Sequence, residues 1–286
     1  MADHTTYGLV CSELSEDLSK TNLGELKLDS FQDNSVQIKI KAASLNFPDL
    51  LMTQGKYQNR PNLPFALGME GAGIVEKVGS GVSSFKEGDE VMFGGWGHGA
   101  IAESIILPEG LVSLKPKSLN FSEAASFKTA YLTAYVGLIR RGELEQGETL
   151  LVHGASGGVG MAAVQMGKLY GARVIASGTS DEKLKIVKTW GADEIINTGL
   201  EGSVSFREEV KDLTEGKGAD VIYDPVGGDV FDESIRCINW GGRLLIIGFT
   251  SGRIPTVPVN YPLIKGFSAV SYTHLTLPTS VLVCVW

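Results

Sequence analysis

The chain has 286 residues, of which 43% are hydrophobic and 20% are charged, so it can bury a sizeable core in one or two domains. Its formal net charge of -8 argues against nucleic acid as a partner, because phosphate backbones require a basic surface. No apolar run approaches the ~20 residues of a membrane span, and the first residues resemble neither a signal nor a transit peptide. We therefore expect a cytoplasmic protein with no membrane partner.

Residues 1–121 predict short β-strands separated by turns. Residues 35–41 alternate apolar and polar side chains, as a half-buried strand does, and further strands are predicted over 73–78 and 88–93. Glycine clusters end the second and third of these strands. Short strands with this punctuation favour a partly open β-barrel.

From Ser122 onward the apolar period changes, and this change alone marks the predicted domain boundary. A helix is predicted over 122–141, and strands and helices then alternate. The strands are predicted at 150–153, 173–177, 194–196, 221–224 and 243–248, and the helices at 159–170, 182–190, 206–214 and 230–238. This order predicts an α/β chain in which residues 122–271 form a doubly wound parallel sheet with helices on both faces.

A glycine-rich turn joins the first of these strands to its helix. The turn has the pattern Ala-x-Gly-x-x-Gly over residues 155–160, which is typical of dinucleotide binding. Glycine lets the backbone approach the pyrophosphate, and the helix that follows directs its first N–H groups at the anion. We therefore predict a pyrophosphate site at Ala155, Gly157, Gly158, Val159 and Gly160.

The end of the next strand indicates which dinucleotide is bound. Enzymes that prefer NAD place an acid there for the ribose 2′-hydroxyl, whereas this chain has Ser177, Gly178 and Thr179, with Lys183 one helical turn later. Hydroxyls, free backbone and a lysine suit the 2′-phosphate of NADP. Asp181 is the acid only if the register shifts, and we assign it to the start of the next helix. The alternative is an ordinary polar loop with a solvated lysine.

Several motifs in fixed order give the chain a family resemblance. They are Ser44–Leu50, Gln54–Tyr57, Leu67–Val75, Gly88–Val91, Leu132–Tyr135, the glycine turn, and Asp224–Gly228. The chain resembles the medium-chain dehydrogenase/reductase superfamily in its quinone oxidoreductase (zeta-crystallin-like) branch. The resemblance implies a GroES-like catalytic domain over residues 1–121 and a Rossmann NADP-binding domain over 122–271, with the active site in the cleft between them.

The positions at which zinc-dependent members of the superfamily carry metal ligands hold other residues here. They fall in Leu45–Phe47 and Gly68–Glu70, which provide no thiolate or imidazole, and His98 and Glu103 are scattered candidates. We therefore predict no metal. Without zinc an alcohol is not easily oxidised, but hydride transfer to a quinone or to the β-carbon of an enone remains feasible.

The resemblance also implies roles for individual residues. Asn46, Asp49 and Tyr57 are implied as catalytic residues that line the cleft, Thr133 as a contact of the nicotinamide, and Gly227, Gly228, Gly248 and Phe249 as loops beside the cofactor. Each has a plainer alternative: a turn around Pro48, a rim aromatic, helix packing, or an ordinary loop. His153 is expected to be structural. Two residues depart from the family pattern, since Lys128 replaces a proline and Thr198 replaces a tyrosine near the adenosine phosphate.

Residues 272–286 contain no Asp, Glu, Lys or Arg and match no family motif. They resemble read-through of vector sequence, so we expect a C-terminally truncated chain that lacks the last part of the fold, including the last Rossmann strand. The alternative is a divergent natural C-terminus. The resemblance implies a homodimer for full-length members, and a truncated chain would lack a strand that pairs two subunits in many relatives. Residues 280–286 are uncharged and β-prone, which predicts aggregation.

The leading functional hypothesis is an NADPH-dependent, zinc-independent reductase of small electrophiles, namely quinones or α,β-unsaturated carbonyls. One alternative is an enoyl-thioester reductase in which Tyr57 donates a proton after hydride addition. Another is an NADPH-binding protein without catalysis, either crystallin-like or inactivated by truncation.

Overall fold

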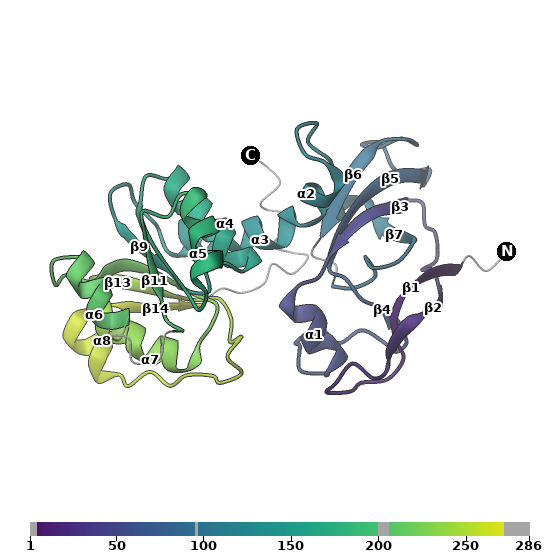
Figure 1. Cartoon of the computed structure of the whole chain (residues 1–286). Helices are drawn as coiled ribbons and strands as arrows, with labels where there is room; N and C mark the ends of the chain where they lie inside the picture. Colours follow the sequence, from purple (N-terminus) through teal and green to yellow (C-terminus); the bar gives the residue numbers. More distant parts are fainter. Residues whose placement is uncertain (1–4, 95–96, 200–205, 272–286) are drawn as a thin grey trace. The chain divides into compact units, whose positions relative to one another are not determined.

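The computed structural model describes residues 5–94, 97–199 and 206–271, and the chain divides into two compact units between Thr129 and Ala130 (Figure 1). Residues 272–286, to which the sequence assigns a non-native tail and an aggregation-prone segment, lie outside the described residues. Among the described residues, no helix combines the length and apolar character needed to cross a membrane.

The first unit contains two antiparallel sheets. The smaller has the order β2-β1-β4 and is formed by β1 (Thr5–Cys11), β2 (Thr21–Lys27) and β4 (Phe65–Ala66). The larger has the order β7-β3-β5-β6-β8 and is formed by β3 (Ser35–Ser44), β5 (Glu70–Val78), β6 (Glu90–Gly94), β7 (Ser104–Pro108) and β8 (Val112–Leu114). The helix α1 (Phe47–Thr53) follows β3, and a 3-10 turn, Glu109–Leu111, precedes β8.

Alternating side chains of β3 build the core of the larger sheet. Val36 and Ile38 are fully buried and pack with Val75, Val91 and Phe93 of the neighbouring strands. Gln37, which lies between Val36 and Ile38, is partly exposed and Lys39 is exposed, which is the alternation that the sequence predicted for a half-buried strand. The register of β3 with β5 places Ser44 opposite Glu70, and this pair lies at the centre of the site described below.

Where the sequence predicts one helix over 122–141, the structure has α2 (Phe121–Ala125), α3 (Phe127–Tyr135) and a π-helix, Val136–Arg141. The first helix begins before Ser122 because Asn120 caps it. The Asn120 side chain accepts from the Glu123 N–H at 2.9 Å, and the Asn120 N–H donates to the Glu123 carboxylate at 2.8 Å. This reciprocal pair is a capping box.

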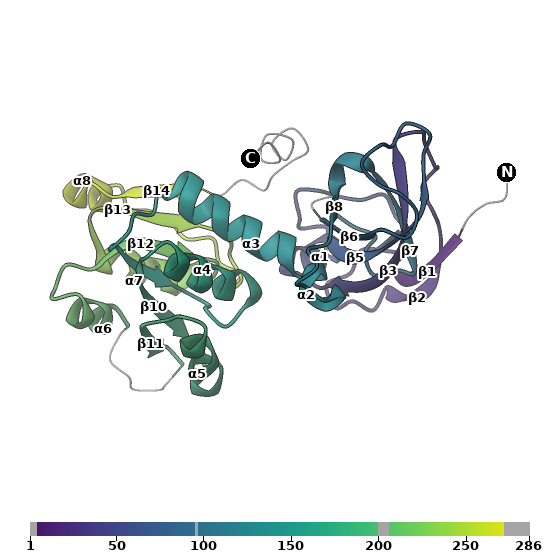
Figure 2. The same cartoon turned by 90° about the horizontal axis from the view of Figure 1, so that it is seen from above.

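The second unit is a six-stranded parallel sheet with the order β11-β10-β9-β12-β13-β14 (Figure 2). The strands are β9 (Thr149–Val152), β10 (Arg173–Gly178), β11 (Glu194–Asn197), β12 (Ala219–Asp224), β13 (Ile238–Ile246) and β14 (Ser268–Ser271). The helices are α4 (Gly158–Leu169), α5 (Asp181–Thr189), α6 (Phe206–Leu213), α7 (Gly228–Cys237) and α8 (Asn260–Lys265). Antiparallel sheets followed by a doubly wound parallel sheet confirm the predicted fold class.

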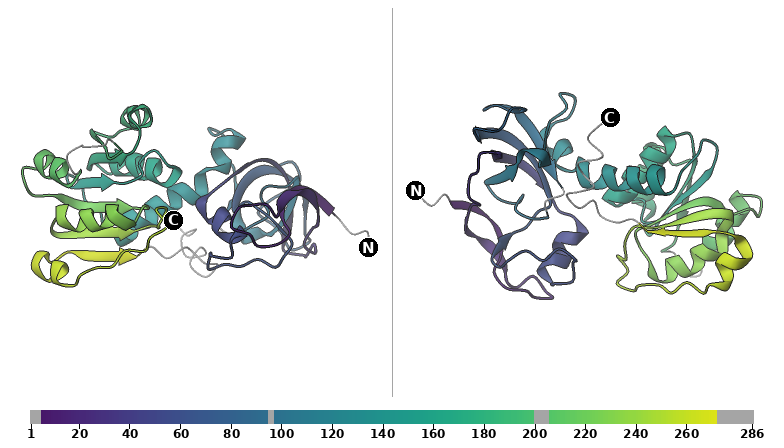
Figure 3. Two further views of the ribbon diagram at one scale, coloured as in Figure 1. Left: turned by 60° about the horizontal axis from the view of Figure 1, so that its bottom comes forward. Right: turned by 180° about the vertical axis from the view of Figure 1, so that it is seen from behind.

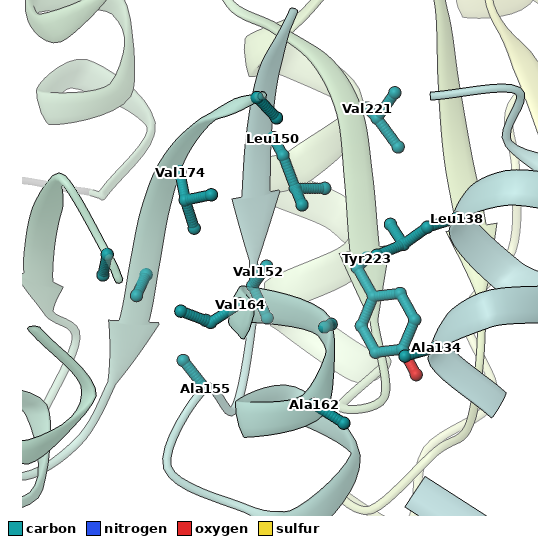
Figure 4. Packing of buried hydrophobic residues seen from close by; sticks show 14 of the residues in the cluster. Ala134, Leu138, Leu150, Val152, Ala155, Ala162, Val164, Val174, Val221 and Tyr223 are labelled. Carbon is teal, nitrogen blue, oxygen red and sulfur yellow. The ribbon is translucent and has the colours of Figure 1, made fainter. Parts of the chain in front are cut away.

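The central strands bury side chains on both faces. Leu150 and Val152 pack with α3 and α4 on one face, where Tyr223 of β12 lies beside Ala134 (Figure 4). Leu151, between them in sequence, packs on the other face with residues of α6 and α7. Helices on both sides are therefore held by strands that are apolar at nearly every position.

Strand order reverses between β9 and β12, which is the switch point where open α/β sheets bind ligands. The edge strand β14 follows α8 and pairs in parallel with β13 (Figure 3). The resemblance implied that the last strand of this sheet would come from beyond Ser271, whereas among the described residues the sheet already has six strands, the last of which ends at Ser271.

Candidate active site

The carboxyl ends of β9, β10, β12 and β13 form one edge of the parallel sheet, and we call their residues 153–160, 177–179, 224–228 and 247–249 the glycine edge. Within it, Gly157 is the N-cap of α4, so the N–H groups of Gly158, Val159 and Gly160 have no acceptor within the helix. Gly158 is exposed, and a Cβ built on it meets no atom within 4 Å. The first turn of α4 thus offers three N–H groups without an acceptor in the helix, beside a glycine whose side-chain position is open, and this combination is suited to a pyrophosphate.

The turn itself can close only with glycine at its third position. A Cβ built on Gly160 would lie 2.3 Å from the carbonyl oxygen of Gly154. Ala155 is fully buried, and its N–H donates to the Ser177 carbonyl at 3.0 Å, which ties the turn to β10. The five residues predicted to bind pyrophosphate therefore lie together, although their contact with a cofactor stays a prediction.

The Ser177 hydroxyl is hydrogen bonded to a buried histidine, and its contact with a cofactor stays a prediction. It lies 2.7 Å from Nδ1 of the buried His153, whose Nε2 lies 2.8 Å from the hydroxyl of Ser234 in α7. Ser234 donates to the Val230 carbonyl at 2.7 Å, so it accepts from Nε2–H, and Nδ1 accepts from Ser177. Burial lowers the pKa of His153 to about 3, so the ring is neutral and structural.

The residues after β10 leave no carboxylate at the end of the strand. Gly178 ends the strand, Thr179 is exposed, and the Ser180 hydroxyl caps α5 by accepting from the Lys183 N–H at 3.4 Å. Asp181 therefore belongs to the first turn of α5, as the sequence predicted. The Lys183 side chain is exposed and forms no ion pair within the described part of the chain.

Thr198 contacts the end of β10 by two hydrogen bonds. Its N–H and its hydroxyl donate to the Gly178 carbonyl at 2.8 Å and 3.2 Å. The residue that departs from the family pattern thus fixes the strand end that carries the predicted phosphate contacts.

The loops after β12 and β13 lie against one another. Asp224 is buried and accepts from the Gly227 N–H at 3.0 Å; burial raises the pKa of this carboxyl, and its backbone hydrogen bonds oppose the rise. Gly227 has φ 69°, and a Cβ there would lie 2.9 Å from the Phe249 ring. The loops that carry Gly227, Gly228, Gly248 and Phe249 therefore lie against one another, and their position beside a cofactor stays a prediction. Thr133 of α3 belongs to the same unit and is buried, at 5% exposure.

In the first unit, a hydrogen-bonded cluster surrounds Asn46, and we call Ser44, Asn46, Asp49, Glu70 and Thr129 the Asn46 network. The Glu70 carboxylate is 1% exposed. One of its oxygens accepts from the Ser44 hydroxyl at 2.6 Å and from the Asn46 amide at 3.0 Å, and the other accepts from the Thr129 N–H at 2.7 Å. Two stretches of the chain, residues 44–46 and the start of α3, thus meet at one carboxylate.

Asp49 holds the backbone on both sides of this cluster. It is 1% exposed, and its two oxygens accept from the N–H groups of Asn46 at 2.7 Å and Gly68 at 3.1 Å. Burial raises the pKa of Asp49 to about 6; the two N–H groups oppose this, and the charge of Glu70 adds to it. Both oxygens are directed at backbone N–H groups, and the catalytic role implied for Asp49 stays a prediction.

Tyr57 lies in a small apolar cluster of the same unit. It is 8% exposed and packs with Cys11, Met52, Phe65 and Leu67. Its burial does not fit the alternative of a rim aromatic. Its role as a proton donor stays a prediction.

The residues at the family's metal positions do not fit zinc. Asn46 directs its amide nitrogen at Glu70, and Met69 packs partly buried against the apolar cluster around Tyr57. His98 lies edge-on to Phe65, with ring centroids 5.9 Å apart. Among the described residues, no three His, Cys, Asp or Glu side chains are grouped to hold a metal ion.

Two contributors were missed by the sequence analysis, Glu70 and Ser234. Glu70 meets Ser44 through the register of β3 with β5, and Ser234 meets His153 across the sheet face. Neither partner is near in sequence, so no local motif pairs them. The sequence offers one signal for Glu70, which is its place at the start of the apolar strand β5. An acid that is buried there requires hydrogen-bond donors.

Comparisons with known proteins agree with this architecture. The family described as "Alcohol dehydrogenase GroES-like domain" matches residues 32–117, and "Zinc-binding dehydrogenase" matches residues 158–279. A "Quinone oxidoreductase-like protein 2 homolog" of Nematostella vectensis is 38% identical over 263 residues, which are 92% of this chain and 70% of the relative. A "Quinone oxidoreductase" of Pseudomonas aeruginosa is 37% identical over 85% of this chain and 73% of its own length.

Solved structures give the same result. A quinone oxidoreductase of Pseudomonas syringae superposes with a TM-score of 0.83 at 31% identity, covering 94% of this chain and 81% of that one. The Escherichia coli quinone oxidoreductase complexed with NADPH gives 0.79 at 28% identity with the same coverage. The chain belongs to the medium-chain dehydrogenase/reductase superfamily, in its quinone oxidoreductase-like branch.

Proposed function

We propose that the chain is a zinc-independent oxidoreductase that uses NADPH to reduce quinones or α,β-unsaturated carbonyls. The observation that carries the proposal is the glycine edge, where the first N–H groups of α4 have no acceptor in the helix and lie at the switch point of the sheet. A phosphorylated dinucleotide fits this edge, and the reduced nicotinamide supplies the hydride when it is bound.

The preference for NADPH rests on the end of β10. No carboxylate follows Gly178 directly, and Lys183 is exposed on the first turn of α5. A carboxylate would repel a 2′-phosphate, whereas a lysine attracts it. The Escherichia coli relative is described as complexed with NADPH, which supports the same preference.

The choice of acceptor rests on the donor set around Asn46. An amide held on Glu70 and the thioether of Met69 cannot bind zinc together, so an alcohol would find no Lewis acid to lower the pKa of its hydroxyl. Quinones and enones need no such activation because they are already electron-poor. The relatives named quinone oxidoreductase support the first class.

The test is a fluorescence titration of the whole chain with NADPH and with NADH, followed by turnover with 1,4-benzoquinone, an enone, an enoyl-thioester and a primary alcohol. We expect tighter binding of NADPH and oxidation of NADPH by the quinone or the enone. Turnover confined to the enoyl-thioester and lost in Tyr57→Phe would favour the thioester reductase instead. Binding without any turnover would favour a non-catalytic role, and zinc-stimulated alcohol oxidation would refute the proposal.

A further inference from the structure

Glu70 is the one side chain that touches every other segment of the Asn46 network. It accepts hydrogen bonds from Ser44 at the end of β3, from Asn46 at the N-cap of α1, and from the third residue of α3, Thr129. A carboxylate at 1% exposure is stable only when its oxygens are hydrogen bonded. The burial of the Glu70 charge therefore depends on all three hydrogen-bond donors staying in place.

A carboxylate has no hydrogen to donate, and this fixes the orientation of its amide partner. The Asn46 amide must turn its nitrogen toward Glu70, because its oxygen would face an acceptor there. The same nitrogen lies 3.1 Å from the Ser44 hydroxyl, which itself donates to Glu70. The Asn46 amide nitrogen thus donates to the Ser44 hydroxyl and to Glu70, which are themselves hydrogen bonded to each other. A flip of the amide would lose both contacts.

We propose that Glu70 is a positioning residue for the reaction, acting through Asn46. The inference rests on the proposed function and assigns Glu70 the task of presenting the Asn46 amide in one orientation. Such preorganisation removes a rotamer search from the catalytic step, and its loss lowers turnover more than cofactor binding. Zinc-dependent relatives place a metal ligand at this motif, whereas here a buried acid organises a neutral amide.

The hydrogen bond to Thr129 allows the orientation of Asn46 to be tested separately from the charge of Glu70. In Glu70→Gln the side-chain oxygen can still accept from Ser44 and Asn46, while the new NH₂ group faces the Thr129 N–H, which loses its acceptor. This variant therefore keeps the orientation of Asn46 and gives up the contact with α3. Glu70→Ala gives up both.

A double-mutant cycle on the full chain tests the proposal, with NADPH and 1,4-benzoquinone as probes. We expect Asn46→Ala and Glu70→Ala each to lower kcat about tenfold or more, and the double variant to fall no further than Asn46→Ala alone. The NADPH Kd is expected to stay within about twofold, because the glycine edge is built within the second unit. Glu70→Gln should retain turnover within about threefold of the parent chain.

Glu76→Gln is the matched control, since this exposed acid on β5 also accepts hydrogen bonds, from Gln37 and Ser104. It should leave all constants unchanged. Additive losses in the double variant, an unaffected Glu70→Ala, or a Glu70→Gln as slow as Glu70→Ala would each overturn the proposal. If Glu70→Ala does not fold, Ser44→Ala completes the cycle with Asn46→Ala under the same criterion. A parent chain that binds NADPH but reduces no acceptor overturns the proposed function, and this inference with it.

Discussion

The glycine edge and the Asn46 network are built from different chemical groups. The first is made of backbone groups: helix N–H groups, a strand end and two loops that touch through their glycines. The second is made of side chains from β3, α1, β5 and α3 that meet through one buried carboxylate. A site of backbone groups depends on where Cβ atoms are absent, whereas a site of side chains depends on register. The two sites should therefore fail in different ways.

The largest effect is expected at Gly160. Its substitution by valine places a Cβ 2.3 Å from the Gly154 carbonyl, so the turn cannot close. We expect the free energy of unfolding to fall by about 3 kcal/mol or more and NADPH binding to be lost. Gly158→Ala is the matched variant, because its Cβ meets no atom within 4 Å. It should keep its stability in a urea titration, and an equal loss in both variants would show that the turn is not closed by this contact.

The second effect is a pH dependence in which the two units oppose each other. The pKa of His153 is lowered to about 3, so its contribution is complete above the ordinary value of about 6.5 and is lost as the pH falls from there toward 3. The slope is about 1.4 kcal/mol per pH unit. The pKa of Asp49 is raised to about 6, so its ionised form destabilises the fold at neutral pH, and this cost is relieved as the pH falls from 6 toward 4.

Chemical denaturation of two variants over pH 4–7 separates these contributions. The free energy of unfolding of the His153→Gln variant should fall less steeply at acid pH than that of the parent chain. In the Asp49→Asn variant it should fall more steeply, because the opposing effect of Asp49 is removed. Both variants need comparison with the parent chain at each pH, since each also changes a buried hydrogen bond. Parallel curves for His153→Gln and the parent chain would mean that the imidazole is not neutral in the fold.

The smallest effect is expected at Lys183, whose side chain is proposed to add a charge contact to a cofactor site that is otherwise made of backbone groups. Lys183→Glu should lower the ratio of NADPH to NADH affinity about tenfold, because a carboxylate repels the 2′-phosphate. Lys185→Glu, which makes the same charge change on an exposed residue of α5, is the control. Isothermal titration with each cofactor gives the ratio, and an equal change in both variants would assign the effect to net charge alone.

The same difference explains how far the sequence predicts the molecule. The turn at Ala155–Gly160 is contiguous, so its pattern predicts both the local structure and the open helix terminus. Asn46 and Asp49 are three residues apart, and their contact follows from one helical turn. Glu70 could not be joined to them, because strand register is decided by the packing of the whole sheet.

The side of the sheet to which Ser177 directs its hydroxyl could also be predicted from the sequence. The pattern around it suggested a hydroxyl for the phosphate, but residues in a strand alternate between faces. Ile175 packs on the face covered by α6 and α7, so Ser177, two residues later, directs its hydroxyl to the same face and meets His153. Periodicity thus identifies the face, while the partner on that face comes from a distant helix.

The buried imidazole has a spectroscopic consequence. Because both ring nitrogens of His153 are hydrogen bonded and the ring is 1% exposed, its Nε2 proton is shielded from solvent and should exchange slowly. It should give a resolved downfield resonance in proton NMR that does not titrate near neutral pH. The ring contacts the hydroxyl of the residue whose carbonyl holds Ala155, so this resonance would report on the phosphate turn without any label on the cofactor.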